Sequence, residues 1–304
     1  MTAALIISAG RTDRKDHFSP ERQIGKISAI ERIALLFKVA RIPRIVVVSD
    51  ENELPQKLVS SMNLVFLTAS AGGEMLDSVK QGLLYLQDKC TEVMIAHVDV
   101  PMFSKQTVQT LMGTAGMVCI PSFRGRCGHP VLLRAACFAD IISYQGAGGL
   151  KGAIDASGID KQIVAVDDAG ILTDSQSGAS YETLLPGHDI SKMRASFQIR
   201  ISREKGFYGP EVHHLLQLTE ELGSLSNACQ HMGMSYTKGR KIISTMEEQM
   251  GTPVLETQQG GKTGGFSHLT KEAKEIMVSY SLFQNEAEVV LQEIFHKHFP
   301  EIDT

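Results

Sequence analysis

GSLSNACQHMGMSYTKGRKIISTMEE, residues 223–248, is the stretch that decides how the C-terminal part of the chain is expected to fold. Ser224 and Ser235 are of the residue type that caps helices, and Gly233 separates the apolar runs that follow them. The stretch therefore predicts two helices joined by a turn. In a helix-turn-helix the second helix meets base edges and phosphates. The candidate DNA contacts are Ser235, Tyr236, Thr237, Lys238, Arg240 and Lys241.

The segment PVLETQQGGKTGGFSHLT, residues 253–270, follows directly. It consists of two short strand-like runs around a glycine-rich tip that carries Lys262, which is typical of a winged hairpin. An ordinary helical pair with a polar face is the alternative for residues 223–248 alone. The hairpin favours a winged helix-turn-helix that binds double-stranded DNA, with Lys262 as a further contact.

These two segments, with KEAKEIMVSY at 271–280, resemble the DNA-binding domain of molybdate-responsive ModE-type regulators, relatives of the LysR-type winged helix. The resemblance covers about residues 207–280, and the Gly-Gly-Lys-x-Gly-Gly tip is its most distinctive part. It implies that the domain binds operator DNA as a dimer. The molybdate-binding module of that family is not seen, so we expect the effector domain elsewhere in the chain.

Charge supports this interpretation only through its placement. Residues 207–304 hold seven Lys and Arg against thirteen Asp and Glu, a net charge of −6, whereas a strongly basic domain would suit DNA better. Four of the basic residues lie on the proposed reading helix and wing. We therefore expect DNA binding that is weak or sensitive to salt.

Length and composition suit two cytoplasmic domains. The chain has 304 residues, of which 43% are hydrophobic and 21% charged. No apolar run is long enough to span a bilayer, and the first residues do not have the order of a signal peptide, so no membrane partner is expected. The five cysteines include no Cys-x-x-Cys pair, which favours reduced thiols. The expected boundaries are a domain at 1–188, a linker at 189–206 and a domain at 207–304.

The first half of the chain alternates buried strands with amphipathic helices. AALII at 3–7 is a strand that runs into SAGRTDR at 8–14, and VMIAHVDVP at 93–101 is a strand that ends on Asp99. This alternation predicts an α/β fold with a largely parallel sheet and ligands at the carboxyl ends of its strands. Asp99 can hold hydrated Mg²⁺ there, or it can cap a helix that begins near Ser104.

Several motifs together resemble the molybdenum cofactor cytidylyltransferase and MobA-like nucleotidyltransferase family over about residues 1–188. They are SAGRTDR, IGKISAIERI, GEMLDSVKQGL, HVDVP, GRCGHPVLL, GGLKGAI and VDDAGILTDSQSGASYETL. The resemblance implies a Rossmann-like three-layer domain that uses Mg²⁺ to join a nucleoside monophosphate, from CTP or GTP, to a pterin phosphate.

Candidate site residues in this domain fall into three groups. Arg14 and Asp99 are the catalytic candidates, with Asp99 also the metal ligand that the resemblance implies. The nucleotide-binding candidates are Ala9, Gly10, Thr12, Arg14, Ser78 and Lys151. The substrate-binding candidates are Arg126, Gly128 and His129.

Departures from the family pattern bear on catalysis. Lys15 and Asp16 stand where the family loop has Met-Gly, and Ser19 aligns with a phosphate-neutralising lysine. Near the end of the domain, Gln176 and Ser180 align with family carboxylates. Such losses of charge are expected to cost orders of magnitude in rate, although ligand binding can survive them.

Three functions are therefore open. The favoured one is a transcription regulator whose degenerate transferase domain senses a nucleotide or pterin cofactor. An active Mg²⁺-dependent nucleotidyltransferase that also binds DNA is the alternative, and a structural partner protein is the third. Whether the chain is an enzyme stays open.

The last helical pattern, residues 270–298, carries apolar residues in alternating steps of three and four. These are Ala273, Ile276, Tyr280, Phe283, Ala287, Val290 and Ile294. A heptad seam of this kind predicts a homodimer through one long helix. Packing of the seam on its own domain is the alternative.

Overall fold

The computed structural model describes residues 1–8, 21–49, 62–70, 73–173, 181–258 and 266–300, with the side chains of Thr257 and Gln258 left aside. The chain divides into two compact units, and the boundary between them lies at Lys192 and Met193. The N-terminal unit is built on a mixed sheet, and the C-terminal unit is mainly helical.

One sheet of eight strands runs through the described part of the N-terminal unit, in the order β10-β7-β9-β6-β1-β4-β5, with β8 paired to β7. β1 pairs in parallel with β4 and β6, β4 with β5, and β10 with β7, whereas β9 is antiparallel to β6 and β7. The strands are β1 (Thr2–Ile7), β4 (Arg44–Ser49), β5 (Val65–Thr68), β6 (Glu92–His97), β7 (Val118–Phe123), β8 (Arg126–Cys127), β9 (Val131–Arg134) and β10 (Lys161–Ala165). The expectation of a largely parallel α/β sheet is confirmed.

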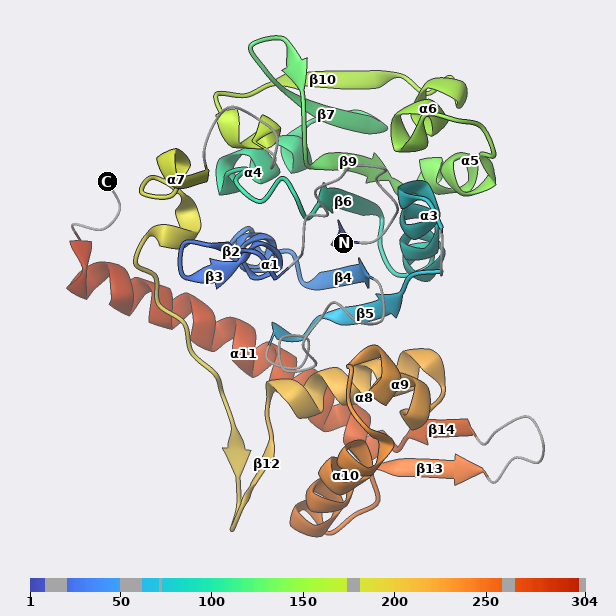
Figure 1. Cartoon of the computed structure of the whole chain (residues 1–304). Helices are drawn as coiled ribbons and strands as arrows, with labels where there is room; N and C mark the ends of the chain where they lie inside the picture. The colour runs from blue at the N-terminus through green and yellow to red at the C-terminus, as the bar shows by residue number, and fades with distance from the viewer. Residues whose placement is uncertain (9–20, 50–61, 71–72, 174–180, 259–265, 301–304) are drawn as a thin grey trace. The chain divides into compact units, whose positions relative to one another are not determined.

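Helices cover both faces of this sheet, which makes three layers. Figure 1 shows α1 and α4 on one side and α3, α5 and α6 on the other. Their bounds are α1 (Ala29–Val39), α3 (Met75–Leu86), α4 (Lys105–Gly113), α5 (Phe138–Ser143) and α6 (Gly149–Ala156). The contact between α3 and β1 is especially close, because a Cβ added at Gly82 would lie 2.4 Å from Leu5 Cδ1. The Rossmann-like layering expected from the sequence is therefore present.

Short elements complete the N-terminal unit. A small hairpin precedes α1, and single turns of helix follow β9 and β10. Their bounds are β2 (Gln23–Ile24), β3 (Ile27–Ser28), η1 (Ala135–Cys137), η2 (Ala169–Leu172), α7 (Tyr181–Leu184) and η3 (Asp189–Ser191). Ser28 and Glu31 form a capping box that starts α1, with Ser28 N donating to Glu31 Oε2 at 2.8 Å.

The C-terminal unit contains four helices among its described residues, together with two antiparallel hairpins. Its elements are β11 (Ile201–Ser202), β12 (Gly206–Tyr208), α8 (Pro210–Leu222), α9 (Leu225–His231), α10 (Tyr236–Met250), β13 (Leu255–Gln258), β14 (Phe266–Leu269) and α11 (Lys271–His298). α9 and α10 begin at the two expected caps, where Ser224 Oγ accepts from Asn227 N and Ser235 Oγ accepts from Lys238 N. They pack closely, because a Cβ added at Gly239 would lie 2.2 Å from Cys229 Sγ.

A buried polar cluster joins three elements of this unit. His213 of α8 lies between Tyr208 of β12 and Ser281 of α11, with Nδ1 3.1 Å from Tyr208 Oη and Nε2 3.2 Å from Ser281 Oγ. The Tyr280 ring lies 5.0 Å from both the Tyr208 and His213 rings, and its hydroxyl donates to Ile199 O at 2.9 Å. Burial lowers the pKa of His213 to about 4, so the cluster requires a neutral imidazole.

The cluster predicts that acid weakens the C-terminal unit. In the unfolded chain His213 titrates near its ordinary pKa of 6.5, whereas in the folded chain it titrates near about 4. The unfolded state therefore binds more protons between these values, and stability falls as pH is lowered through that window. Since one pKa unit corresponds to about 1.4 kcal/mol, the loss from this group is at most about 3.5 kcal/mol.

Urea unfolding at several pH values, with wild type and His213→Gln compared, checks this expectation. The variant should be less stable near neutral pH, and its stability should change less between pH 6.5 and 4. Equal pH dependence in the two proteins would contradict the role given to His213.

Candidate functional site

The carboxyl ends of three adjacent strands meet at one edge of the sheet. Ser8 follows β1 and donates its N–H to Val48 O of β4 at 2.9 Å, and Val98 N, just after β6, donates to Ile7 O at 3.0 Å. The hydroxyls of Ser8 and of Ser49, which ends β4, are buried and have no hydrogen-bond partner in the described part of the chain. In open α/β sheets this edge is where ligands bind.

Asp99 stands at this edge, two residues beyond β6. Its Oδ1 atom contacts Nδ1 of His97, the last residue of β6. The side chains of His97 and Asp99 are 15% and 21% exposed, so the pair is accessible from one side. The main-chain carbonyl of Asp99 accepts a hydrogen bond of 2.7 Å from Tyr181 Oη. Asp99 is therefore held by α7 as well as by β6.

His129 lies beside this pair, at the start of the antiparallel strand β9. Ile95 and Val131 are partners across β6 and β9, and a cis peptide joins His129 to Pro130. Burial lowers the pKa of His129 and His97 lowers it further, whereas Asp99 and a hydrogen bond that the ring donates to the Ile95 carbonyl oppose the shift. The imidazole is thus held neutral at the edge, and its Nδ1 has no partner among the described residues.

Gly128 and His129 are placed by the backbone of η2. His129 N donates to Ile171 O at 3.0 Å, and a Cβ added at Gly128 would lie 2.1 Å from that same oxygen. Because no side chain fits there, glycine is required at position 128 for the chain to pass this point. Gly128, His129 and Asp99, three of the predicted site residues, are therefore found in one neighbourhood.

Three other predicted residues have no described contact with Asp99 or His129. Ser78 is buried in the first turns of α3. Lys151, in the first turn of α6, is exposed and pairs with Asp155 Oδ2 at 3.0 Å. Arg126 is exposed on β8, in the hairpin whose turn residues Arg124 and Gly125 have positive φ. None of these side chains shows a hydrogen bond or ion pair to Asp99 or His129 within the described residues.

Several predicted positions fall outside the described residues. In the N-terminal unit these are Ala9, Gly10, Thr12, Arg14, Lys15, Asp16, Ser19, Gln176 and Ser180. In the C-terminal unit the predicted DNA contact Lys262 also lies outside the described residues.

The described surroundings of Asp99 supply one carboxylate for the expected Mg²⁺ site, with the imidazoles of His97 and His129 beside it. Mg²⁺ is commonly held by one or two carboxylates together with substrate phosphates and water, and a single carboxylate such as Asp99 suits that mode of binding. Over the described ranges, no group of three or more His, Cys, Asp and Glu is arranged to hold a metal ion. Sequence reasoning missed His97, because Asp99 lies in the turn after β6 and the alternation of side chains along the strand does not extend to it.

The helix α4 is not capped by Asp99, which was the alternative role for that residue. Ser104 Oγ accepts from Thr107 N at 3.1 Å, and Asp168 Oδ2 accepts from Ser104 N at 2.7 Å and from Thr107 Oγ1 at 2.6 Å. Lys105 N donates to Asp189 Oδ2 at 2.6 Å. Two carboxylates from the end of the unit therefore occupy the first turn of α4.

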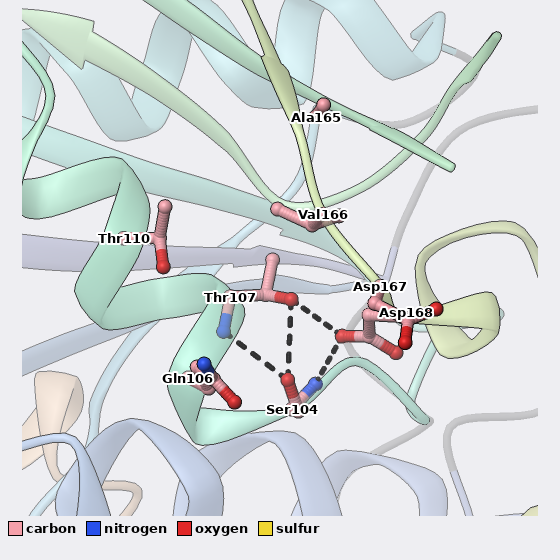
Figure 2. Close-up of a pocket in the computed structure, with 8 residues that line it drawn as sticks. All are labelled: Ser104, Gln106, Thr107, Thr110, Ala165, Val166, Asp167 and Asp168. Carbon is pink, nitrogen blue, oxygen red and sulfur yellow. Dashed lines mark hydrogen bonds between the residues drawn. The ribbon is translucent and has the colours of Figure 1, made fainter. Parts of the chain in front are cut away.

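A small open pocket of about 150 Å³ lies against this cap (Figure 2). Its walls come from α4 with its cap, from the last residue of β10 and from the chain that follows β10. They are Ser104, Gln106, Thr107, Thr110, Ala165, Val166, Asp167 and Asp168. Asp168 is turned toward the helix by its hydrogen bonds, as Figure 2 shows, so the pocket presents mainly a helix cap.

The predicted DNA-contacting residues occupy one side of α10. Ser235, which caps the helix, and five residues of its first two turns are all exposed, whereas Gly239 between them is buried against Cys229. The five are Tyr236, Thr237, Lys238, Arg240 and Lys241. Lys238 Nζ pairs with Glu211 Oε1 of α8 at 2.6 Å.

No helix in the described part of the chain combines the length and apolar character that a bilayer span requires.

Known proteins are similar to this chain over different regions. A nucleotidyl transferase from Methanothermobacter thermautotroptrophicus has a similar structure, with a TM-score of 0.51 and 17% identity over 63% of this chain and 97% of that one. A 4-diphosphocytidyl-2C-methyl-D-erythritol synthase from Anaerococcus prevotii has a TM-score of 0.49 and 10% identity, over 60% and 95%. At this identity the first likeness shows the fold alone, which is a nucleotidyltransferase fold.

The transcriptional regulator ModE of Haemophilus influenzae is 29% identical over 82 residues, which are 27% of this chain and 32% of the regulator. The chain thus spans about a third of the length of that curated relative. The family model of the MobA-like NTP transferase domain matches residues 4–162. Since this match spans more than half of the 304 residues, the chain belongs to the MobA-like NTP transferase domain family.

Proposed function

We propose that this protein is a DNA-binding transcription regulator whose nucleotidyltransferase-like unit binds a nucleotide or a molybdenum-pterin cofactor as its effector. The observation that carries the proposal is the exposed polar and basic face of α10, which starts at a capped first turn. The similarity to part of a ModE regulator supports the same conclusion.

Several features of the described C-terminal unit support the proposal of a winged helix-turn-helix. α9 and α10 pack through Gly239 and Cys229, which holds the second helix against the first. Thr237, Lys238 and Arg240 then face outward, as the residues of a recognition helix do. β13 and β14 form an antiparallel pair that follows, and we propose that Lys262, which lies between them in the sequence, contacts the DNA backbone as part of a wing.

Electrostatics sets the expected strength of this binding. The net charge of −6 over residues 207–304 disfavours nonspecific attraction, so affinity must come from the few lysines and arginines of the reading face. Lys238 is paired with Glu211 before DNA arrives, and a phosphate has to replace that partner. Binding is then expected to weaken steeply with salt.

The first test of DNA binding replaces one exposed cation on the reading face. Arg240→Ala should weaken binding to mixed-sequence duplex DNA at low salt and reduce the slope of log K against log salt by about one unit, because one phosphate contact is lost. Lys297→Ala, in the last turn of α11, is the control with the same charge change. Fluorescence anisotropy over a salt series measures both, and identical curves for wild type and both variants would place the DNA face elsewhere.

An active nucleotidyltransferase that also binds DNA is the second candidate. Asp99 with Gly128 and His129 at the carboxyl edge of the sheet favours it, because the fold still gathers these residues. Against it stand the replacements at Ser19, Gln176 and Ser180, which remove charge that a transferring phosphoryl group needs. Binding without turnover suits a sensor, since a ligand shifts a conformational equilibrium only through its different affinities for the two states.

Pyrophosphate release separates the two candidates. With CTP or GTP and a molybdenum-pterin acceptor, we expect turnover far below about one per second, the low end of ordinary enzymes. Turnover at or above that rate in wild type, lost in Asp99→Ala, would rank the enzyme first. Circular dichroism of both proteins verifies that the variant is folded.

We also propose that the regulator is a homodimer through α11. Ala273 and Tyr280 of the apolar seam are buried within their own unit, whereas Phe283, Val290 and Ile294 are about half exposed. The N-terminal part of the seam therefore packs on its own unit, which was the alternative to a dimer. The C-terminal part, from Phe283 onward, is the outer end, which a second copy can cover. An exposed apolar helix face of this length is a common feature of protein interfaces.

Charges on the outer end of the seam should abolish the dimer. Phe283→Asp combined with Val290→Asp places carboxylates where two helices would meet, and both positions tolerate the change in a monomer because they are exposed. Light scattering should show half the wild-type mass. Val278→Asp with Val289→Asp, on another side of the helix, is the matched control. A wild type that is monomeric, or a double variant with unchanged mass, would contradict the proposal.

A further inference from the structure

The hairpin of β11 and β12 is basic, although the unit that contains it is acidic. With the extended segment before it, this part of the chain covers residues 193–206, which hold three arginines and one lysine against one glutamate, a net charge of +3. Residues 207–304, which make up most of the same unit, have a net charge of −6. All four basic side chains are exposed. They are Arg194, Arg200, Arg203 and Lys205.

The tip of this hairpin is attached to one side of α10. β12 and α10 are neighbours within the C-terminal unit (Figure 1). The Arg203 guanidinium donates to Gln249 O at 2.7 Å, and Lys205 N donates to Gln249 Oε1 at 3.2 Å. Gln249 comes eleven positions after Lys238, which is about three helical turns, so the two residues lie on the same side of α10. The hairpin tip therefore lies on the side of α10 that carries Lys238.

Arg200 lies toward the other end of that side. Its Cγ atom is 3.3 Å from the position of a Cβ added at Gly209, which is the N-cap of α8. Glu211, two residues further on, accepts from Lys238 Nζ at 2.6 Å. The start of α8 thus lies between Arg200 and Lys238. Basic side chains of the hairpin segment therefore border α10 near both of its ends.

The charges on the hairpin are not neutralised by carboxylates of the described chain. Arg203 donates to a main-chain carbonyl, which carries no full charge. No ion pair to Arg200, Arg203 or Lys205 occurs among the residues that the structure describes. Lys238, by contrast, is paired with Glu211. The hairpin cations can therefore bind an external phosphate without first breaking an ion pair of the protein.

We infer that this hairpin is a second phosphate-binding edge beside α10, with Arg200, Arg203 and Lys205 contacting the backbone of double-stranded DNA. The inference rests on the proposed function, because α10 has to enter a groove before the hairpin can reach the phosphates that border it. Contacts of this kind fix the orientation of the protein on the duplex and add affinity, but they do not read base edges.

The number of phosphate contacts gives the inference a measurable size. The cations already proposed to meet DNA are Lys238, Arg240, Lys241 and Lys262. Each phosphate contact contributes about 0.9 to the slope of log K against log salt, so four contacts give a slope of about 3.6 in magnitude. Three further contacts from the hairpin raise it to about 6.3. A hairpin that only supports α10 leaves the slope at the smaller value.

The experiment measures binding of the full-length protein to a mixed-sequence duplex by fluorescence anisotropy, between about 50 and 200 mM salt. Arg200→Gln with Lys205→Gln removes two cations whose side chains form no ion pair or hydrogen bond with the described residues. The slope should fall by about 1.8, so the loss of affinity across this salt range should shrink by about twelvefold. Lys271→Gln with Lys297→Gln, on α11, is the matched control, since it removes the same charge outside the hairpin.

Glu204→Gln tests the same surface in the opposite direction. Glu204 is exposed at the tip of the hairpin, where its carboxylate repels a phosphate. Its replacement should strengthen binding by about two- to threefold at low salt, a gain that a purely supporting hairpin does not predict. Glu286→Gln, exposed on α11, is the control with the same charge change. Circular dichroism and the melting temperature verify that each variant is folded.

Each result has a distinct meaning. A smaller slope in the double hairpin variant, with the α11 control at the wild-type slope, supports the inference. Hairpin variants that all bind as wild type does overturn it and leave DNA binding through α10 standing, which Arg240→Ala tests separately. Equal changes in the hairpin variants and their α11 controls also overturn it, because net charge alone then explains them. Wild type that binds no DNA at any salt concentration overturns the proposed function as well.

Discussion

The complete burial of β1 is the constraint on which the N-terminal unit depends. Ala3 to Ile7 are at most 1% exposed, and their parallel pairing with β4 on one side and β6 on the other leaves no freedom of register. A slip by one residue would turn every side chain to the opposite face of the sheet. Because all three strands are locked together, their carboxyl ends meet at one edge, and Ser8, Ser49 and Asp99 are neighbours for that reason alone.

The C-terminal unit depends on a different kind of constraint, the fit between two helices. Gly239 lets α10 approach Cys229 of α9 so closely that an added methyl group would overlap the sulfur. Burial of that one position turns the flanking residues Lys238 and Arg240 to the outside. The neutral His213 cluster ties α8 and α11 to β12 in the same unit.

Much of this architecture could be predicted from the sequence, because it follows from local patterns. Buried apolar runs such as 3–7 and the serine caps at 224 and 235 lead directly to strands and helix starts. The site could be predicted only in part. Asp99 and His129 are visible as motif residues, but the pairing of Asp99 with His97 depends on how β6 ends.

The contacts that come from far along the chain could not have been foreseen. Tyr181 reaches Asp99 across 82 residues, and Asp168 and Asp189 reach the start of α4 across 64 and 84. No local pattern encodes such pairs, because the sheet order alone decides which loops become neighbours. The same dependence on tertiary structure explains why the seam on α11 divides into a buried end and an exposed end.

The carboxylates at the start of α4 affect where an anion can bind at this edge of the sheet. The amino end of a helix carries partial positive charge. In three of the helices carboxylates already accept hydrogen bonds from backbone N–H groups there: Asp168 and Asp189 at α4, Glu31 at α1, and Asp77 at α3. α6 begins at the same edge with Gly148 and Gly149 and has no acidic residue in its first turn. Among these four helices, the electrostatic potential is therefore most favourable to an anion at α6, on the side of the sheet that lies away from α4.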